Sequence, residues 1–594
     1  MIHHEEEVLG KAYDARLMRR LMTYLKPYKG SIILAVTLLL VVSLLQLVGP
    51  ILTMVAIDQY IAQGNGEGLF KIALLYFGVL LFIFVLRYGQ TLLTQYTGQR
   101  VMVEIRMALF RHIQRLHLAF FDRTPVGRLM TRLTGDVENL KEVLTSGVVA
   151  IFGDVFTLIG IVTVMVLFHP KLALVTFSVI PILFFATLLF KTKVRESYRL
   201  IRTRLARMNA YLQENITGMR IVQIFNREEK NFEKFDHLNR LHLDAYLKTI
   251  FYYSLFFPGV SLIRSIAIGL ILWYGGVRIL GDGLTLGILV AFIQFAERFF
   301  QPIQDLSEKY NILQTAMASS ERIFQLLDTE VKIEDPLKPL PFERIEGHIQ
   351  FEGVSFAYHD HDYVLKEISF EVQKGERVAL VGATGAGKTS IINLLCRFYE
   401  PQEGQILIDG KDIRQVRQKD LRRHIGVVLQ DVFLFSGTIA SNIRLGNGNL
   451  TAEDLQRAAK VVNAHRFINR LPRGYEEKVS ERGSNLSQGE RQLLAFARAL
   501  AHNPEILLVL DEATASVDTE TEYLIQDALA KLMKDRTSII IAHRLSTIQQ
   551  VDRILVLHKG RIREEGTHQE LLRQGGLYAK LYELQYKDMV HVGD

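Results

Sequence analysis

The chain contains an uncharged stretch that is long enough to cross a lipid bilayer. No charged residue occurs from Gly30 to Ile57, whereas a transmembrane helix needs only about 20 mostly apolar residues. The stretch therefore predicts a membrane-spanning helix near the start of the chain. A chain that begins in this way is constrained to a membrane fold, at least in its first part.

Further apolar stretches follow in the first half of the chain. They cover residues 69–93, 148–168, 172–190, 252–274 and 284–300. With the first stretch they predict six transmembrane helices in an all-α domain. The stretch 69–93 is interrupted by Lys71 and Arg87. Four other charged residues inside the stretches could line a substrate path or pair with neighbouring groups; they are Asp154, Arg264, Glu297 and Arg298.

The distribution of basic residues predicts how these spans are oriented. Residues 95–145 carry eight Lys and Arg and residues 191–250 carry thirteen, whereas residues 58–68 carry none. Basic segments stay on the cytoplasmic side, so six spans place both termini in the cytoplasm. Both basic segments also show helical periodicity, which predicts helices that extend the spans into the cytosol. The amphipathic residues 14–28 predict a helix on the inner membrane surface.

The charge balance does not require a nucleic-acid partner. The net charge is +7, and the Lys and Arg residues gather beside apolar spans, where anionic lipid headgroups are a sufficient partner. We therefore expect membrane lipid and no nucleic acid as a partner. Cys396 is the only cysteine, which excludes an intrachain disulfide and a thiolate metal site.

The composition changes near residue 330. Residues 328–347 are polar and contain three prolines, which indicates a linker. Short apolar runs alternate with helical patterns beyond it, as is typical of an α/β domain with a mainly parallel sheet. The predicted organisation is a tail and interfacial helix (1–29), a transmembrane domain (30–328), a linker (329–347) and an α/β domain (348–594).

A phosphate-binding loop lies in the α/β domain. The sequence VALVGATGAGKTSIINLL is an apolar strand, a glycine-rich turn and a helix, in the order that such a loop requires. The glycines let successive amides face phosphates, Lys388 supplies a charge to the β and γ phosphates, and Thr389 supplies a hydroxyl to Mg²⁺. The candidate ATP-binding residues of this loop are Gly382, Thr384, Gly385, Ala386, Gly387, Lys388, Thr389 and Ser390.

Two acids end a later apolar run, ILLVLDE. Ligands of parallel sheets gather at such strand ends, so we expect Asp511 to hold Mg²⁺ and Glu512 to polarise the attacking water as general base. His543 ends the next run, TSIIIAH, and could contact the γ phosphate and hold that water in line. Taken alone, a residue such as His543 is more often an ordinary histidine at a strand end.

A second helix start that suits an anion lies at LSQGERQ, residues 486–492. The amides of Ser487 to Gly489 should point out of the helix toward a negative charge. The phosphate-binding loop lies elsewhere in the sequence, so this start predicts a second group that contacts phosphate.

These motifs, in this order, resemble those of ATP-binding cassette (ABC) exporter half-transporters. GATGAGKT resembles the Walker A motif, VLDE resembles Walker B, LSQGE resembles the signature and ERG at 481–483 resembles the segment that precedes it in exporters. The resemblance implies a P-loop NTPase domain that hydrolyses ATP. It further implies that Tyr358 stacks on adenine, that Gln430 senses Mg²⁺ and water, that Asp518 belongs to the D-loop and that His543 is the switch histidine.

The membrane half shows weaker similarity to the same family. Residues 120–136 and 213–229 look like the cytoplasmic segments that dock onto nucleotide-binding domains, and residues 298–306 look like the sixth helix. The resemblance therefore extends over nearly the whole chain.

The resemblance also implies a dimer. In the family the signature of one cassette completes the ATP site of the other, so Ser487, Gln488 and Gly489 would face a nucleotide held by a second half-transporter. Gln488 and Glu490 replace the Gly and Gln of the usual LSGGQ. In heterodimeric members, a subunit with an intact Walker B glutamate often carries an altered signature, which favours a heterodimer over a homodimer here.

The function implied is ATP-driven export of an amphipathic drug, lipid or peptide across the cytoplasmic membrane by alternating access, with ATP and Mg²⁺ as cofactors. One alternative is a fused importer, for example of metal chelates. Another is a membrane-anchored ATPase without transport, against which the six spans and the docking segments argue.

Overall fold

The computed structural model describes residues 14–143, 145, 148–281, 283–359, 362–429, 431–511, 519–542 and 545–590. The chain divides into two compact units. The membrane unit comprises the residues up to 114 together with 127–329, and the cassette unit comprises 115–126 together with the residues from 330 on. Each unit is described by itself below.

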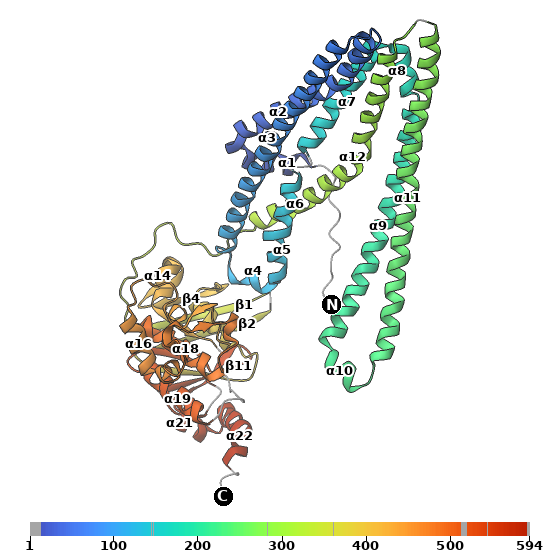
Figure 1. Cartoon of the computed structure of the whole chain (residues 1–594). Coiled ribbons are helices and arrows are strands. Elements are labelled where there is room, and N and C mark those ends of the chain that lie inside the picture. The colour runs from blue at the N-terminus through green and yellow to red at the C-terminus, as the bar shows by residue number, and fades with distance from the viewer. Residues whose placement is uncertain are drawn as a thin grey trace. The chain divides into compact units, whose positions relative to one another are not determined.

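The membrane unit is built of helices in its described part (Figure 1). Three short non-α turns join some of them: a 3₁₀ turn (Lys26–Tyr28) and two π-helical turns (Ala56–Ile61 and Arg132–Asp136). The α-helices are α1 (Ala15–Leu25), α2 (Lys29–Val55), α3 (Gly66–Ile113), α5 (Val126–Thr131), α6 (Val137–Glu142), α7 (Val148–Phe168), α8 (Pro170–Phe177), α9 (Ile180–Thr217), α10 (Met219–Ile224), α11 (Glu228–Leu280) and α12 (Leu286–Leu327).

Five helical segments of the described chain are long and apolar enough to cross a membrane. They are Ala15–Ile61, Gly66–Ile113, Ala150–Phe168, Pro170–Thr217 and Glu228–Leu280. The chain is thus a multi-pass membrane protein. Most of the sixth predicted span, residues 284–300, lies in the first half of α12. This helix is not among the five segments, so the predicted count of six is only partly confirmed.

The predicted span 172–190 is interrupted. Helix α8 ends at Phe177 and α9 begins at Ile180, with Ser178 and Val179 between them. Pro181 follows at once, and a proline ring clashes with the carbonyl of the residue four positions earlier. That residue is Phe177, so Pro181 favours a break at this point, although α2, α11 and α12 continue through Pro50, Pro258 and Pro302.

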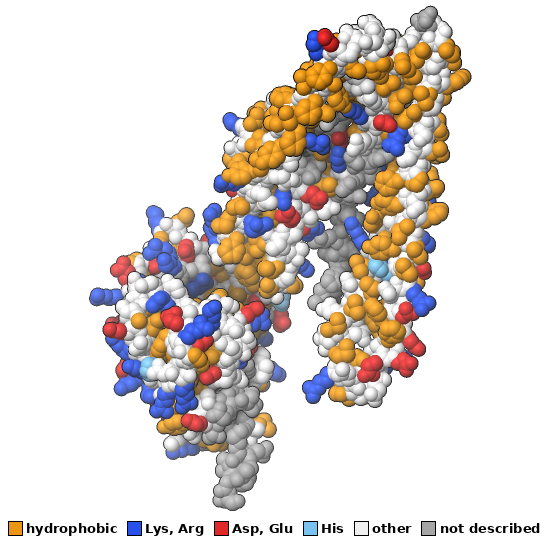
Figure 2. Space-filling model, viewed as in Figure 1, with side chains coloured by type: hydrophobic (Ala, Val, Ile, Leu, Met, Phe, Trp, Pro, Cys, Tyr) orange, Lys and Arg blue, Asp and Glu red, His pale blue; other side chains and the backbone are white. Residues whose placement is uncertain are grey.

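Exposed apolar side chains mark the part of the membrane unit that faces lipid. Phe70, Phe77 and Phe84 on α3 are all more than half exposed, and Figure 2 shows hydrophobic side chains over much of this surface.

Two of the charged residues in the predicted spans, Asp154 and Arg298, have partners within the protein. Lys309 forms an ion pair with Asp154, and Arg298 donates to the carbonyl of Gln46. Pairing with neighbouring groups is therefore confirmed for these two.

Helices α9 and α11 run side by side and α10 joins their far ends (Figure 1). Their length, 38 and 53 residues, exceeds a bilayer span of about 20 residues. Both helices therefore continue beyond the apolar stretches that they contain. Helix α1 is the predicted amphipathic helix, and the side chain of Asp14 caps its first turn.

The cassette unit contains two main sheets. A six-stranded sheet has the order β12-β11-β3-β10-β9-β6, in which only β12 is antiparallel to its neighbour. A four-stranded antiparallel sheet has the order β2-β1-β4-β5, and β7 pairs with β8. The strands are β1 (Ile349–Ala357), β2 (Tyr363–Val372), β3 (Arg377–Val381), β4 (Glu403–Ile408), β5 (Lys411–Asp412), β6 (Ile425–Val428), β7 (Gly437–Thr438), β8 (Lys478–Val479), β9 (Ile506–Asp511), β10 (Thr537–Ala542), β11 (Arg553–His558) and β12 (Arg561–Gly566).

The cassette unit also contains helices, which mostly alternate with its strands along the chain, as the α/β prediction required. They are α4 (Leu118–Arg123), α13 (Lys388–Leu395), α14 (Gln418–Arg423), α15 (Ile439–Arg444), α16 (Ala452–Val461), α17 (Ala464–Ile468), α18 (Gln488–Ala501), α19 (Thr519–Met533), α20 (Leu545–Ile548), α21 (His568–Gln574) and α22 (Leu577–Val590).

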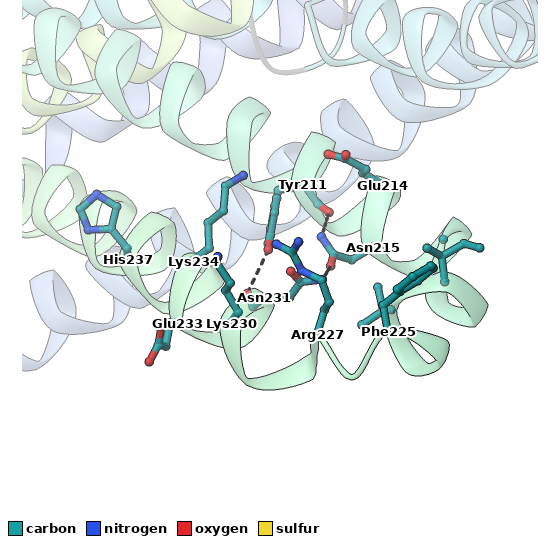
Figure 3. Close-up of a pocket in the computed structure, with 13 residues that line it drawn as sticks. Tyr211, Glu214, Asn215, Phe225, Arg227, Lys230, Asn231, Glu233, Lys234 and His237 are labelled. Atoms are coloured by element: carbon teal, nitrogen blue, oxygen red, sulfur yellow. Dashed lines mark hydrogen bonds between the residues drawn. The ribbon is translucent and has the colours of Figure 1, made fainter.

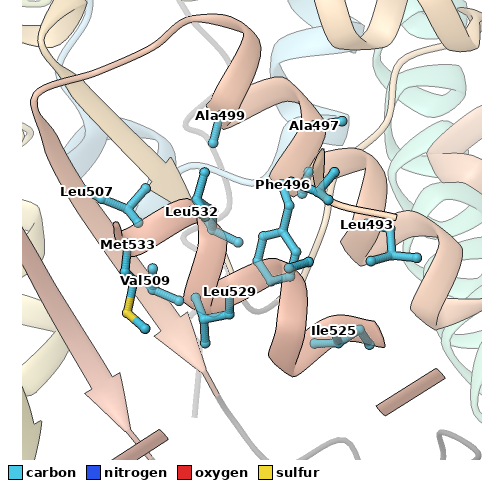
Figure 4. Close-up of a cluster of buried hydrophobic side chains, with 14 of the residues drawn as sticks. Leu493, Phe496, Ala497, Ala499, Leu507, Val509, Ile525, Leu529, Leu532 and Met533 are labelled. Carbon is cyan, nitrogen blue, oxygen red and sulfur yellow. The ribbon is translucent and has the colours of Figure 1, made fainter. Parts of the chain in front are cut away.

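A buried apolar cluster fixes α18 against the sheet (Figure 4). Phe496 of α18, Val509 of β9 and Leu529 of α19 are each at most 2 % exposed and belong to it. Burying such a side chain contributes about 1.5–3 kcal/mol. The cluster therefore holds α18 and α19 rigidly together on the parallel sheet.

Candidate nucleotide-binding site

Four neighbouring parallel strands end at one edge of the large sheet. The register pairs Leu380 of β3 with Ile541 of β10, and Ala542 of β10 with Asp511 of β9, and β6 follows on the other side of β9. The carboxyl ends of parallel strands form the usual ligand-binding edge of an α/β sheet. The phosphate-binding loop begins at this edge, directly after Val381.

The other predicted catalytic residues follow the same strand ends in the sequence. Glu512 comes directly after β9, His543 directly after β10, and Gln430 two residues after β6. All three lie outside the described residues, as does Asp518. The backbone of Asp511 ends β9 at this edge.

The backbone of the phosphate-binding loop requires glycine at two positions. A Cβ on Gly382 would lie 2.3 Å from the carbonyl oxygen of Leu557, and one on Gly387 would lie 2.5 Å from Leu365 Cδ2. Gly387 also has a φ of 104°, which disfavours any residue with a side chain. Thr384 and Gly385, at the top of the loop, are exposed, so a ligand can reach the loop.

Lys388 is the first residue of α13 and is only 7 % exposed. Its Nζ donates to the carbonyl oxygens of Gly382, at 2.6 Å, and Ala383, at 3.2 Å. The ammonium is thus held inside the loop itself. Thr389 is exposed next to it. The Thr389 hydroxyl is a hard oxygen ligand of the kind that Mg²⁺ takes together with phosphate oxygens. The side chain of Asp511, the other predicted ligand, lies outside the described part of the structure.

Tyr358 lies beside α13. Its hydroxyl is 3.0 Å from Ser390 Oγ and accepts from Asn393 Nδ2 at 3.3 Å. The rings of Phe356 and Tyr399 meet the Tyr358 ring edge-on, with centroids 4.7 and 5.0 Å away. Tyr358 itself is half-buried. An aromatic ring held in this way next to a phosphate-binding loop can stack on a nucleotide base.

The start of α18 is capped by its own residues. Ser487 Oγ accepts from the amide of Glu490 at 3.3 Å, and the Glu490 carboxylate accepts from the amide of Ser487 at 2.8 Å. This is a capping box, in which Gln can take the place of Glu. The acid that departs from the family signature is therefore engaged in its own helical turn.

Gly489 has a packing role that the sequence did not reveal. It is buried, and a Cβ there would lie 2.2 Å from Thr521 Cγ2 on α19. The two residues are distant in the sequence, so no local pattern predicts the contact. A glycine at this position lets α18 approach α19.

Arg498 of α18 is a further residue that sequence reasoning missed. Its guanidinium donates to the carbonyl oxygens of Asn442, at 2.9 Å, and Phe433, at 3.2 Å. The Asn442 side chain in turn bonds both the amide and the carbonyl of Phe435 at 2.8 Å. Burial lowers the pKa of Arg498. The segment that follows Gln430 is thus tied to the signature helix.

A separate pocket lies in the membrane unit, between α9 and α11 next to α10 (Figure 3). Tyr211 donates to the carbonyl of Asn231 at 3.1 Å, and Asn231 Nδ2 donates to Asn215 Oδ1 at 2.6 Å. These bonds fasten the two helices just before the turn. Ile224 and Phe225, at the turn, are 61 % and 68 % exposed. This turn lies in the second predicted docking segment.

Two family models match the chain. A family model for the ABC transporter transmembrane region matches residues 32–303, and an ABC transporter model matches residues 365–515. The chain is 39 % identical to the uncharacterized ABC transporter ATP-binding protein YknV of Bacillus subtilis, over 99 % of this chain and 98 % of that protein.

Two further relatives have more descriptive names. The chain is 41 % identical to the probable multidrug resistance ABC transporter ATP-binding/permease protein YheH of Bacillus subtilis, over 88 % of this chain and 78 % of that protein. It is 36 % identical to the ATP-dependent lipid A-core flippase of Syntrophus aciditrophicus, over 96 % of this chain and 95 % of that protein.

Proposed function

The chain belongs to the ABC transporter family, and from this premise we propose that it exports an amphipathic drug, lipid or peptide across the cytoplasmic membrane. Its ATP-binding domain lies in the cytoplasm and couples ATP hydrolysis to transport, as in the family. The observation that carries the export proposal is similarity over nearly the whole chain to relatives named for multidrug resistance and lipid A-core flipping.

We propose that the edge of the parallel sheet binds the ATP. Lys388 and the loop amides bind the β and γ phosphates, with Thr384, Gly385, Ala386 and Ser390 completing the loop, and Tyr358 stacks on adenine. Thr389, Gln430 and Asp511 hold Mg²⁺, which neutralises charge on the phosphates. Support comes from the shared edge at which β3, β10, β9 and β6 end and from Lys388 inside the loop.

Hydrolysis is assigned to residues that follow the same strands. Glu512 takes a proton from the attacking water as general base, and His543 holds that water in line with the γ phosphate. Their places in the sequence, one residue after β9 and one after β10, support this assignment, because both strands end at the edge of the sheet where the phosphate-binding loop begins.

A chain with one membrane region and one ATP-binding domain is a half-transporter, and half-transporters work as dimers. We propose that Ser487, Gln488 and Gly489 contact ATP held by the second subunit, with Asp518 of the D-loop at the same interface. The capping box supports this, because the Glu490 carboxylate accepts a hydrogen bond from the Ser487 amide and so already has a partner within its own helical turn. The altered signature and the intact Glu512 favour a heterodimer.

ATP-driven closure of the two cassettes would then be passed to the membrane helices. The segments around α4 and α10 are the proposed docking elements, and the exposed Ile224 and Phe225 give α10 an apolar docking face. Closure draws the cytoplasmic helices together and opens the transmembrane path outward. Hydrolysis removes the γ phosphate that bridges the cassettes and resets the path.

The proposal is tested by transport into inside-out membrane vesicles. A fluorescent cationic dye should accumulate in vesicles that contain the transporter when ATP is added, and Glu512→Gln should abolish accumulation. Dye or lipid probes that never accumulate, together with ATP-driven uptake of a metal chelate into whole cells, would establish the importer instead. ATPase activity that ignores lipid and rises with nucleic acid would establish the anchored ATPase.

A further inference from the structure

The short helix α4 belongs to the cassette unit although it comes from the membrane half of the sequence. Residues 115–126 form one compact unit with the cassette, and Ala119 packs against the buried cluster that contains Phe356 and Leu394. Helix α4 therefore has fixed neighbours among the residues that surround the nucleotide site.

The last two residues of α4 reach the neighbourhood of Tyr358 by separate routes. The Arg123 guanidinium donates to the backbone carbonyl of Tyr358 at 2.8 Å and is 3.3 Å from His359 Nδ1. The hydroxyl of Tyr399 donates to the Asp122 carboxylate. One contact thus holds the backbone of Tyr358, and the other holds the ring that meets Tyr358 edge-on.

The contact between Tyr399 and Asp122 is partly buried. Tyr399 is 9 % exposed, and burial together with the Asp122 carboxylate raises the pKa of its hydroxyl. The hydroxyl therefore stays protonated at physiological pH and remains a donor. On the far side of Tyr358, Ser390 and Asn393 of α13 hold the phenol oxygen. The ring is fixed between α4 with its partner Tyr399 on one side and the phosphate-binding helix on the other.

We propose that Asp122 and Arg123 are positioning residues for the base of the nucleotide. The contacts of α4 with Tyr358 and Tyr399 then set the affinity of the site for adenine. This inference rests on the proposed function, because it takes Tyr358 as the residue that stacks on adenine. In the proposed site the phosphates are bound by the loop and Lys388. The described hydrogen bonds of Asp122 and Arg123 go to other residues. Asp122 and Arg123 therefore affect the binding of the base, whereas the loop and Lys388 bind the phosphates.

Such an arrangement has a reciprocal consequence. If the contacts of α4 with Tyr358 and Tyr399 strengthen the binding of adenine, the binding of adenine must stabilise these contacts by the same factor. A change in the membrane segment that carries α4 would then be felt as a change in affinity for the base. Each hydrogen bond concerned is worth about a two- to tenfold change in affinity.

The test compares a ligand that has the base with one that lacks it. The full chain in lipid nanodiscs is titrated with adenylyl imidodiphosphate, which is not hydrolysed, and inorganic tripolyphosphate is used as a competitor. We expect Arg123→Ala and Asp122→Ala to weaken adenylyl imidodiphosphate binding by about two- to tenfold, with tripolyphosphate affinity changed by less than that. Arg123→Lys, which keeps a donor and the charge, should recover most of the loss.

Tyr399→Phe gives an independent variant that keeps the aromatic packing. It should match Asp122→Ala, and the double variant should be no weaker than either single one, because both remove the same bond. Arg207→Ala, which changes an exposed arginine on α9 outside both predicted docking segments, is the matched control and should leave both affinities unchanged.

The outcomes separate the inference from the proposed function. Equal losses for both ligands, or no loss in Arg123→Ala and Tyr399→Phe, would overturn the positioning role. A wild-type protein that binds adenylyl imidodiphosphate no better than Lys388→Ala does would overturn the nucleotide site itself.

Discussion

Two helices of the cassette unit begin in ways that suit an anion, and they are built differently. Helix α13 follows Gly387, which has a left-handed backbone and no side chain with which to cap the helix. Helix α18 follows Ser487, whose hydroxyl and amide both bond Glu490 in a closed capping box. The first start has no side-chain cap, whereas the second is capped by its own residues.

This difference matches the proposed roles of the two helices. The start of α13 binds the phosphates of a nucleotide carried by its own chain, together with Lys388. The start of α18 must keep its shape when no nucleotide is present, because its ligand arrives with the second subunit. A self-capped helix that is packed rigidly against α19 meets that need.

The largest expected effect is on the α13 side. Lys388→Ala removes the cation that the loop holds, so ATP turnover should fall by about 100-fold or more, and nucleotide binding should weaken with it. Turnover by the purified dimer in nanodiscs measures this. Normal turnover in the variant would show that the loop does not bind the phosphates.

The next largest effect on turnover is expected at the start of α18, where a substitution should leave nucleotide binding to the isolated chain intact. Gly489→Ala places a Cβ 2.2 Å from Thr521 Cγ2, so the start of α18 must shift. Misplacement on this scale should cost about 10- to 100-fold in turnover, while binding of adenylyl imidodiphosphate to the isolated chain stays unchanged. Adding Thr521→Ser, which removes the clashing methyl group, should restore part of the activity. A loss of binding in Gly489→Ala would contradict the separation of the two helix starts.

A smaller effect is expected at Glu490. Glu490→Ala removes the acceptor for the Ser487 amide and should cost ~1 kcal/mol of local helix stability. Amide hydrogen exchange in the first turn of α18 should then be about fivefold faster. Glu490→Gln preserves the capping box and is the matched control. If both variants exchange like the wild type, the capping box does not stabilise this helix start.

The smallest effect concerns Cys396, directly after α13. The thiol is 2 % exposed and burial raises its pKa to about 12. The thiolate is the reactive form, and it is populated only as pH approaches that value, so a maleimide at pH 7 should not modify the folded chain. Labelling should become complete in denaturant. Rapid labelling of the folded protein would show that the end of α13 opens readily.

The sequence predicted the parts of the site that are contiguous in the chain. The phosphate-binding loop, the strand before it and the start of α18 each follow from a few adjacent residues, and the structure has them at the predicted positions. The contact between Gly489 and Thr521 and the bonds of Arg498 to Phe433 and Asn442 join distant segments. Local patterns cannot predict such contacts, because they depend on how the helices pack.

The membrane half shows the same limit. Apolar length predicted where the helices lie, but the break before Pro181 and the pairing of Asp154 with Lys309 depend on backbone sterics and on neighbouring helices. The role of Glu490 also changed once its partner was known. The sequence showed an acid near a phosphate site, whereas the structure shows that this acid bonds the amide of Ser487.

The central claim is that each ATP is bound by α13 of one chain and contacted by α18 of another. ATP turnover per chain should therefore be compared in nanodiscs that hold one copy and in nanodiscs that hold the dimer. The account predicts that a single copy binds adenylyl imidodiphosphate but hydrolyses almost no ATP, and that pairing restores turnover. A single copy that hydrolyses ATP as fast as the dimer would contradict it.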